Sequence, residues 1–159
     1  MNASPSPTPP QAIPAALIYR LLAIIYDLLP LAALWMATSA AMLLARGGEK
    51  VAPNSPAALF EFILLLLVSF AYLGVSWRRG GQTLGMRAWR LRLVCVDGSA
   101  PPSWGTLISR YLFAAISWAA CGLGFLWSLI DSERRTWHDL ASGTVLVRLP
   151  KSKKIKPAA

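Results

Sequence analysis

Three long apolar stretches, with segments rich in arginine and lysine after the second and the third, constrain the fold of this chain more than any other feature. The first stretch covers residues 15–44 and the second covers residues 57–77. About 20 apolar residues are enough for a helix to cross the hydrocarbon core of a bilayer. Each of these two stretches therefore predicts a transmembrane helix, and the chain is expected to be an integral membrane protein.

The third stretch, residues 107–130, fits two arrangements. It is long enough for a single crossing, but residues 121–124 (Cys-Gly-Leu-Gly) form a natural break near its middle. A single crossing would also put the two most basic segments of the chain on opposite sides of the membrane. We therefore favour two short helices, over residues 104–120 and 124–130, that form a re-entrant or interfacial pair. A single span is the alternative.

The basic residues indicate which side of the membrane the loops occupy. The chain has 16 Lys and Arg against 7 Asp and Glu, a net charge of +9. Residues 78–92 hold five arginines and no acid, and residues 134–156 hold seven basic residues with one acid. By the positive-inside rule both segments are cytoplasmic. We therefore expect a multi-pass membrane protein with a cytoplasmic C-terminus.

The same basic segments suggest partners. We expect Arg78, Arg79 and Arg87 to contact anionic lipid headgroups, since arginines beside a span commonly do so. The lysine-rich C-terminal end has no aromatic stacking platform or recognition fold beside it, so no specific nucleic-acid partner is expected. Because two or three spans make a thin wall for a site within the membrane, a homo-oligomer or another membrane protein is the expected protein partner.

Two short runs are typical of β-strands. Residues 89–96 begin with strict alternation, and residues 143–149 form a second β-prone run. Since a lone strand leaves its backbone groups unpaired, the two are expected to pair. The predicted architecture is an all-α membrane protein with a small cytoplasmic two-stranded β element. Residues 1–14 are expected to be a disordered proline-rich tail, residues 15–149 the membrane domain and residues 150–159 a basic tail.

Ionisable residues within the apolar stretches are the strongest candidates for a site, because each costs about 2.5–3.5 kcal/mol to insert. Arg20 and Asp27 are two turns apart on one helix face. We expect Arg20 to pair with an acid near the cytoplasmic surface, such as Asp139, or to reach the headgroups. Asp27 is expected to pair with Arg110. The alternative for Arg110 is that its side chain anchors the helix at the membrane interface. These four residues form a predicted polar cluster and a candidate ion or proton site.

Other chemistry is not indicated. Cys95, Cys121 and the single His138 lack the spacing of a zinc site. No phosphate-binding loop, nucleophile elbow or paired-carboxylate pattern occurs. We therefore expect no enzymatic activity, no metal and no cofactor.

Several of these features together resemble one family. They are Arg20 and Asp27 in the first helix, residues 81–87 (Gly-Gln-Thr-Leu-Gly-Met-Arg) and residues 134–145 (Arg-Arg-Thr-Trp-His-Asp-Leu-Ala-Ser-Gly-Thr-Val). In order and type they are similar to the RDD family of bacterial membrane proteins, over roughly residues 16–147. The resemblance implies that Arg20, Asp27 and Asp139 stand at the name-giving positions, with Asp131 as a second candidate for the last.

The family offers limited guidance on function. Sodium/proton antiport is attributed to some members, which implies a role for Asp27 in alternately binding a proton and a cation. Two hypotheses follow. The first and favoured one is a scaffold, assembly or lipid-interacting module with a buried Arg/Asp cluster. The alternative is an oligomeric cation/proton antiporter that uses Asp27.

Overall fold

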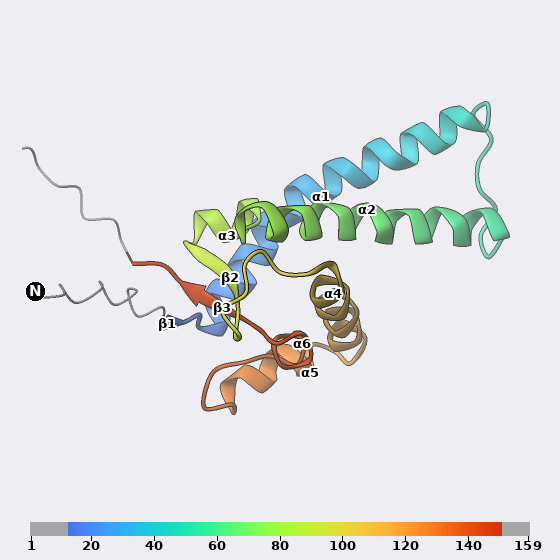
Figure 1. Cartoon of the computed structure of the whole chain (residues 1–159). Coiled ribbons are helices and arrows are strands. Elements are labelled where there is room, and N and C mark those ends of the chain that lie inside the picture. The colour runs from blue at the N-terminus through green and yellow to red at the C-terminus, as the bar shows by residue number, and fades with distance from the viewer. Residues whose placement is uncertain (1–12, 151–159) are drawn as a thin grey trace, which may run out of the picture.

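The computed structural model describes residues 13–150 (Figure 1). Its longest elements are helices α1 (Leu17–Ala45) and α2 (Pro56–Gly80), which form a hairpin that projects from a smaller body (Figure 1). Both helices are long and apolar enough to cross a membrane. The two predicted apolar helices are therefore present. Helix α1 begins two residues after the predicted stretch and ends one residue beyond it, and α2 begins one residue earlier and ends three residues later.

Local interactions define the ends of α2 and hold the hairpin together. The Ser55 hydroxyl accepts a hydrogen bond from the backbone N–H of Ala58 (3.2 Å), which caps the first turn. At the other end Gly81 takes a left-handed conformation (φ 67°) that stops the helix. Between the helices, the Trp35 indole donates to the Ser69 hydroxyl (2.8 Å).

The third apolar stretch is broken, as predicted. Helix α4 (Trp104–Ala119) is followed by α5 (Leu123–Leu126) and the 3-10 helix η1 (Trp127–Leu129), and the two parts are bent by 108°. The bend occurs at Cys121 and Gly122, which have φ values of 52° and 81°. This is the shape of a broken span or a re-entrant loop, and a straight single helix is not formed.

The two β-prone runs pair as predicted, but the sheet has three strands and not two. Strand β2 (Leu91–Cys95) lies antiparallel to β3 (Thr144–Arg148), and β1 (Ile13–Pro14) pairs with the other edge of β3. The third strand comes from the end of the segment predicted to be a tail. It forms because β3 would otherwise leave that edge open, and the backbone N–H of Ala15 extends the pairing by donating to the Leu146 carbonyl (2.9 Å). Residues 1–12 and 151–159, the rest of the two predicted tails, lie outside the described residues.

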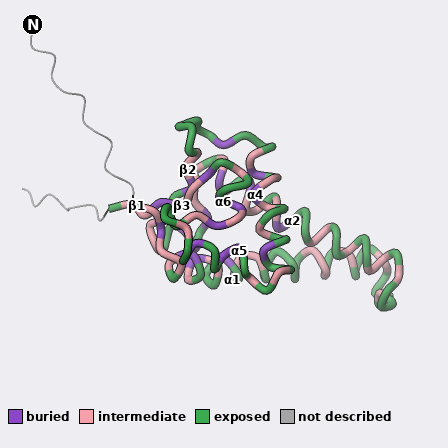
Figure 2. The backbone as a smooth tube through the Cα atoms, turned by 90° about the horizontal axis from the view of Figure 1, so that it is seen from below, coloured by how far each residue is buried: buried purple, intermediate pink, exposed green. Residues whose placement is uncertain are grey.

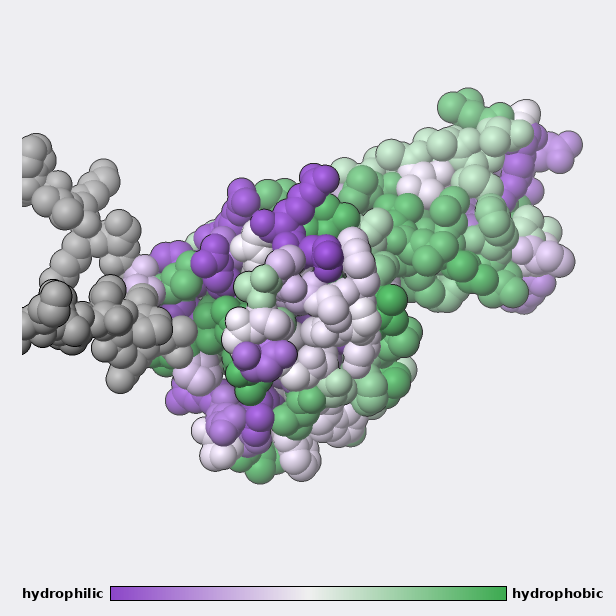
Figure 3. Space-filling view, viewed as in Figure 1, coloured by the Kyte–Doolittle hydropathy of each residue, from purple (hydrophilic) through white to green (hydrophobic). Residues whose placement is uncertain are grey.

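Buried residues concentrate where the sheet, α4 and the short helices α3 (Leu84–Ala88) and α6 (Trp137–Ser142) meet the base of the hairpin (Figure 2). Leu91 and Leu107 are fully buried there. The projecting part of the hairpin instead carries exposed apolar side chains along most of its length (Figures 2 and 3). Such a surface is stable in contact with lipid, so the hairpin has the outer face of a membrane segment.

Helix α3 packs unusually closely against α1 at Gly85. A Cβ atom at this position would lie 2.0 Å from the carbonyl oxygen of Ala23 and 3.0 Å from Cγ of Asp27. No side chain fits at that distance, so a residue without a Cβ is required for this contact. The contact also sets the position of α3 relative to Asp27.

We expect Gly85→Ala to lower the free energy of unfolding by about 3 kcal/mol, because the backbone of α1 must move to accept the new methyl group. The matched control is Gly105→Ala on α4, where the nearest atom to the added Cβ is the Ser103 hydroxyl at 3.7 Å. That change should leave stability within about 1 kcal/mol of the unsubstituted protein. Thermal unfolding in detergent, followed by tryptophan fluorescence, measures both. Equal effects of the two substitutions would contradict the close packing.

Candidate functional site

The carboxylate of Asp139 on α6 lies between two arginines from two different apolar helices. Its Oδ1 accepts a hydrogen bond from Nη1 of Arg110 on α4 (2.6 Å), and its Oδ2 accepts one from Nη1 of Arg20 on α1. All three side chains are at most 4% exposed. We call Arg20, Arg110 and Asp139 the arginine–aspartate cluster.

Local sequence places Asp139 in this position. It is the fourth residue of a capping box that begins at Thr136: the Thr136 N–H donates to Oδ2 of Asp139 (3.2 Å), and the Asp139 N–H donates to the Thr136 hydroxyl (3.4 Å). The backbone and side chain of Thr136 therefore hold Asp139 in addition to the two arginines. Asp131, the other candidate aspartate, lies outside the cluster and forms an ion pair with Arg135 (3.6 Å).

The arginines extend the cluster into the neighbouring segments. Arg110 also donates to the Thr144 hydroxyl at the start of β3 (2.7 Å). Arg20 also donates to the carbonyl oxygens of Ala15 (3.1 Å) and Arg134 (2.9 Å). One carboxylate and two guanidiniums thus join α1, α4, α6, the sheet and the loop before α6.

Two opposing effects act on the acidity of Asp139. Burial favours the neutral acid, but the positive charges of Arg110 and Arg20 outweigh it and hold the pKa of the carboxyl below its usual range. Asp139 is therefore ionised in the folded protein. Its single negative charge compensates one of the two positive charges of the buried arginines.

The predicted pairing of Arg20 with Asp139 is confirmed, and the predicted pairing of Asp27 with Arg110 is wrong. Arg110 is directed to Asp139 and Thr144. Both arginines are buried, so neither side chain reaches the headgroups as the alternatives required. The sequence placed Arg110 inside an apolar stretch, but it held no information on which of two aspartates would face it.

Asp27 has a separate set of partners. Its Oδ1 accepts hydrogen bonds from the Tyr72 hydroxyl (2.7 Å) and the Gly85 N–H (2.9 Å), and its Oδ2 accepts one from the Thr83 hydroxyl. These donors come from α2, from α3 and from the residue that caps α3. Sequence reasoning missed all three. The available signal was the glycine-rich segment 81–87, whose Thr83 and Gly85 begin α3.

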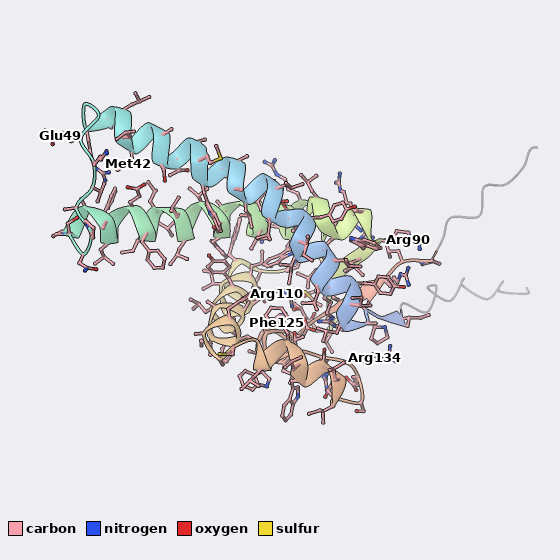
Figure 4. The ribbon with its side chains drawn as sticks, turned by 180° about the vertical axis from the view of Figure 1, so that it is seen from behind. Met42, Glu49, Arg90, Arg110, Phe125 and Arg134 are labelled. Carbon is pink, nitrogen blue, oxygen red and sulfur yellow. The ribbon has the colours of Figure 1, made fainter. Side chains whose placement is uncertain are left out.

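A cavity of about 500 Å³ separates the two sets of contacts, bounded by α1, α2, α4 and the body beneath them. Its walls are mostly apolar, but Asp27, Arg110 and His138 also line it. Arg110 of α4 and Phe125 of α5, both labelled in Figure 4, line this cavity. Within residues 13–150, Nε of Arg110 and Nδ1 of His138 are buried without a hydrogen-bond partner. Over the same residues, no group of three or more His, Cys, Asp or Glu side chains could hold a metal ion.

The arginines predicted to contact headgroups differ in their surroundings. Arg78 donates to the Pro102 carbonyl (2.9 Å) and stacks on the Trp104 ring (5.2 Å to its centroid). Arg79 and Arg87 are exposed. Lipid contact therefore remains a prediction for all three, and Arg78 also has a structural role.

The fold and these contacts define a membrane-type protein whose apolar helices are joined to a small sheet by buried arginine–aspartate pairs. The model of the RDD family matches residues 14–143, and the chain belongs to that family. No curated protein and no solved structure matches the chain.

We expect Asp139→Asn to lower the free energy of unfolding by about 3–5 kcal/mol, because it leaves two guanidiniums buried without a counter-charge. Glu49→Gln is the control, since Glu49 is exposed in the loop between α1 and α2 and makes no side-chain contact described in residues 13–150. Denaturant unfolding in detergent measures the difference. A loss below about 1 kcal/mol for Asp139→Asn would contradict the role given to the cluster.

His138 predicts a specific pH dependence. Burial, together with the charge of Arg110, lowers the pKa of His138 to about 3. In the unfolded chain the pKa is about 6.5, so below that pH only the unfolded state takes up the proton, and stability falls as the pH drops. Between pH 7 and pH 5 the loss should be about 2 kcal/mol.

Because His138 is the only histidine in the chain, a His138→Phe variant tests this directly. Stability should become nearly independent of pH between 7 and 5 in that variant, whatever its absolute value. A slope that persists in His138→Phe would assign the pH dependence to another group.

Proposed function

We propose that this RDD-family chain is a small lipid-interacting scaffold of the bacterial inner membrane, and that its buried arginines and aspartates hold its helices and strands in register. Such a scaffold needs no catalytic group and no cofactor. Its partners are membrane lipids and either a second copy of the chain or another membrane protein.

The observation that most directly supports the scaffold proposal is how Asp27 is bound. Three donors from the protein itself, Tyr72, Thr83 and Gly85, bind its two oxygens. An ion-exchanging carboxylate must leave its protein partners for a proton or a cation at each cycle. Here the same contacts hold α1, α2 and α3 together, so their release would disturb the packing of the hairpin base. This favours a structural role for Asp27.

The distribution of charge supports the placement in the membrane. The exposed face of the hairpin is apolar, while hydrophilic side chains lie at its tip and around α3 and the sheet (Figure 3). With the arginine-rich segments and the C-terminus on the cytoplasmic side, the chain follows the positive-inside rule. The sheet and α6 would then form a cytoplasmic platform attached to the spans through the arginine–aspartate cluster.

The alternative, an oligomeric cation/proton exchanger, makes a different prediction for Asp27→Asn. For a scaffold, this substitution replaces a charged acceptor with a neutral amide, lowers stability by about 2 kcal/mol and reduces the amount of folded protein in the membrane. For an exchanger, folded protein is retained and proton-coupled cation flux in proteoliposomes is lost.

Tyr72→Phe is the companion variant, because it removes one donor and leaves Asp27 able to ionise. We expect a smaller loss of stability, about 1 kcal/mol, and proteoliposomes that show no coupled flux with either variant or with the unsubstituted chain. Coupled flux that depends on Asp27 would overturn the scaffold proposal. The mass of the intact assembly in mild detergent then identifies whether the partner is a second copy.

A further inference from the structure

Three arginines outside the buried contacts line a second hollow of the molecule. Arg90 lies just before β2, Arg134 in the loop before α6, and Arg148 at the end of β3; together they border a pocket of about 400 Å³ beside the start of α1. We call it the arginine pocket. Figure 4 shows Arg90 and Arg134 on either side of the first turns of α1. The remaining wall consists of Ile13, Pro14, Ala16, Tyr19, Leu149 and Pro150.

Within residues 13–150, no acidic side chain compensates the positive charge of this pocket, and none lines it. Among the described residues, none of its three arginines forms an ion pair, whereas Arg20 and Arg110 both bind Asp139. Like charges held around one hollow repel each other, so the arrangement is more favourable with an anion bound between them.

Two of the pocket arginines are held in an uncommon backbone conformation. Arg90 and Arg134 have φ values of 56° and 55°, and within residues 13–150 only four non-glycine residues have a positive φ. This conformation costs about 1–2 kcal/mol for a residue with a side chain. Core contacts maintain it: the Arg90 carbonyl accepts from the Leu149 N–H (2.8 Å), and the Arg134 carbonyl accepts from Arg20 (2.9 Å). The fold therefore fixes the backbone from which both side chains extend.

The third arginine is oriented by an aromatic ring. The guanidinium carbon of Arg148 lies 3.7 Å from the centroid of the Tyr19 ring. A guanidinium stacked in this way keeps its N–H edge free for the oxygens of a phosphate, which it binds through two parallel hydrogen bonds.

The pocket lies where the apolar surface of α1 begins. Tyr19 is in its wall, and the neighbouring Ile18 and Leu21 are 56% and 40% exposed apolar side chains. A tyrosine beside exposed aliphatic residues at one end of a span is typical of headgroup depth. An anion at this level is most readily the phosphate of a lipid whose acyl chains lie along α1.

We infer that the arginine pocket binds the phosphate of an anionic membrane lipid, with Arg90, Arg134 and Arg148 as donors. This inference deepens and rests on the proposed function, because it names the lipid class and the site of a lipid-interacting scaffold. The binding adds no covalent step. It makes the chain selective for anionic over zwitterionic lipid at one site, beyond the general attraction of its basic surface.

The test uses the full chain, purified in mild detergent, freed of lipid and titrated with mixed micelles of phosphatidylglycerol or of phosphatidylcholine. The pocket variant is Arg90→Gln, Arg134→Gln and Arg148→Gln together. The matched comparison is Arg79→Gln, Arg87→Gln and Arg92→Gln, which removes the same charge from exposed arginines outside the pocket, two of them predicted to contact headgroups without a defined site. Native mass spectrometry counts the bound lipid.

We expect the unsubstituted chain to retain one phosphatidylglycerol in preference to phosphatidylcholine. The pocket variant should weaken that binding at least 10-fold, and the control no more than 3-fold. Equal weakening in the two triple variants would overturn the inference in favour of diffuse charge. If inorganic phosphate competes for the pocket as strongly as phosphatidylglycerol does, the occupant is not a lipid. The pocket is then a site for free phosphate.

Arg134→Gln alone provides the answer if the triple pocket variant does not fold. The Arg134 side chain is exposed and makes no hydrogen bond or ion pair in the described part of the chain, so its removal leaves the fold intact. It should still weaken phosphatidylglycerol binding at least 3-fold; unchanged binding would overturn the inference. Failure of the scaffold proposal is a separate result, since it appears as Asp27-dependent cation flux and not as a change in lipid binding.

Discussion

The rest of the structure depends on one ionised carboxylate held by two buried guanidiniums. Asp139 meets Arg20 and Arg110 at the point where α1, α4 and α6 converge, with Thr144 of β3 bound to the same Arg110. A buried ion pair adds little net stability over a well-packed apolar contact, because each charge must give up its water. Its main effect is on the specificity of folding. Any arrangement that separates Arg20, Arg110 and Asp139 leaves an unpaired charge in an apolar interior. The cluster therefore specifies one packing of these elements among several that would bury similar apolar area.

Asp27 holds the base of the hairpin together in a similar way, but none of its partners is a cation. Its donors are two hydroxyls and one backbone N–H, and Gly85 must lack a Cβ for α3 to approach closely enough. Each aspartate thus joins a different set of elements. Asp139 attaches the sheet and α6 to α1 and α4, and Asp27 attaches α3 to both helices of the hairpin. The cavity between them has mostly apolar walls, with Arg20, Arg110 and His138 on the side of Asp139 and Asp27 and Thr83 on the other.

The coarse architecture could be predicted from the sequence because it depends on composition along the chain. The two apolar helices, the break at Cys121 and Gly122 and the pairing of β2 with β3 all follow from hydropathy, turn residues and the need to pair a strand. The Arg20–Asp139 pair followed from charge and topology. The partners of Asp27 could not be found in this way, because one is a backbone N–H and two of the three depend on how the five-residue helix α3 packs. Strand β1 was missed since two residues that include a proline carry no strand pattern.

The contacts of strand β1 and of Arg20 join parts of the chain that are synthesised at very different times. The chain immediately before the first span pairs with β3, which lies at the opposite end of the sequence, and Arg20 bonds to a carboxylate 119 positions later. Neither contact exists while the ribosome is still producing the middle of the protein. The start of α1 and the strand before it can therefore reach their final contacts only after α6 and β3 have been synthesised.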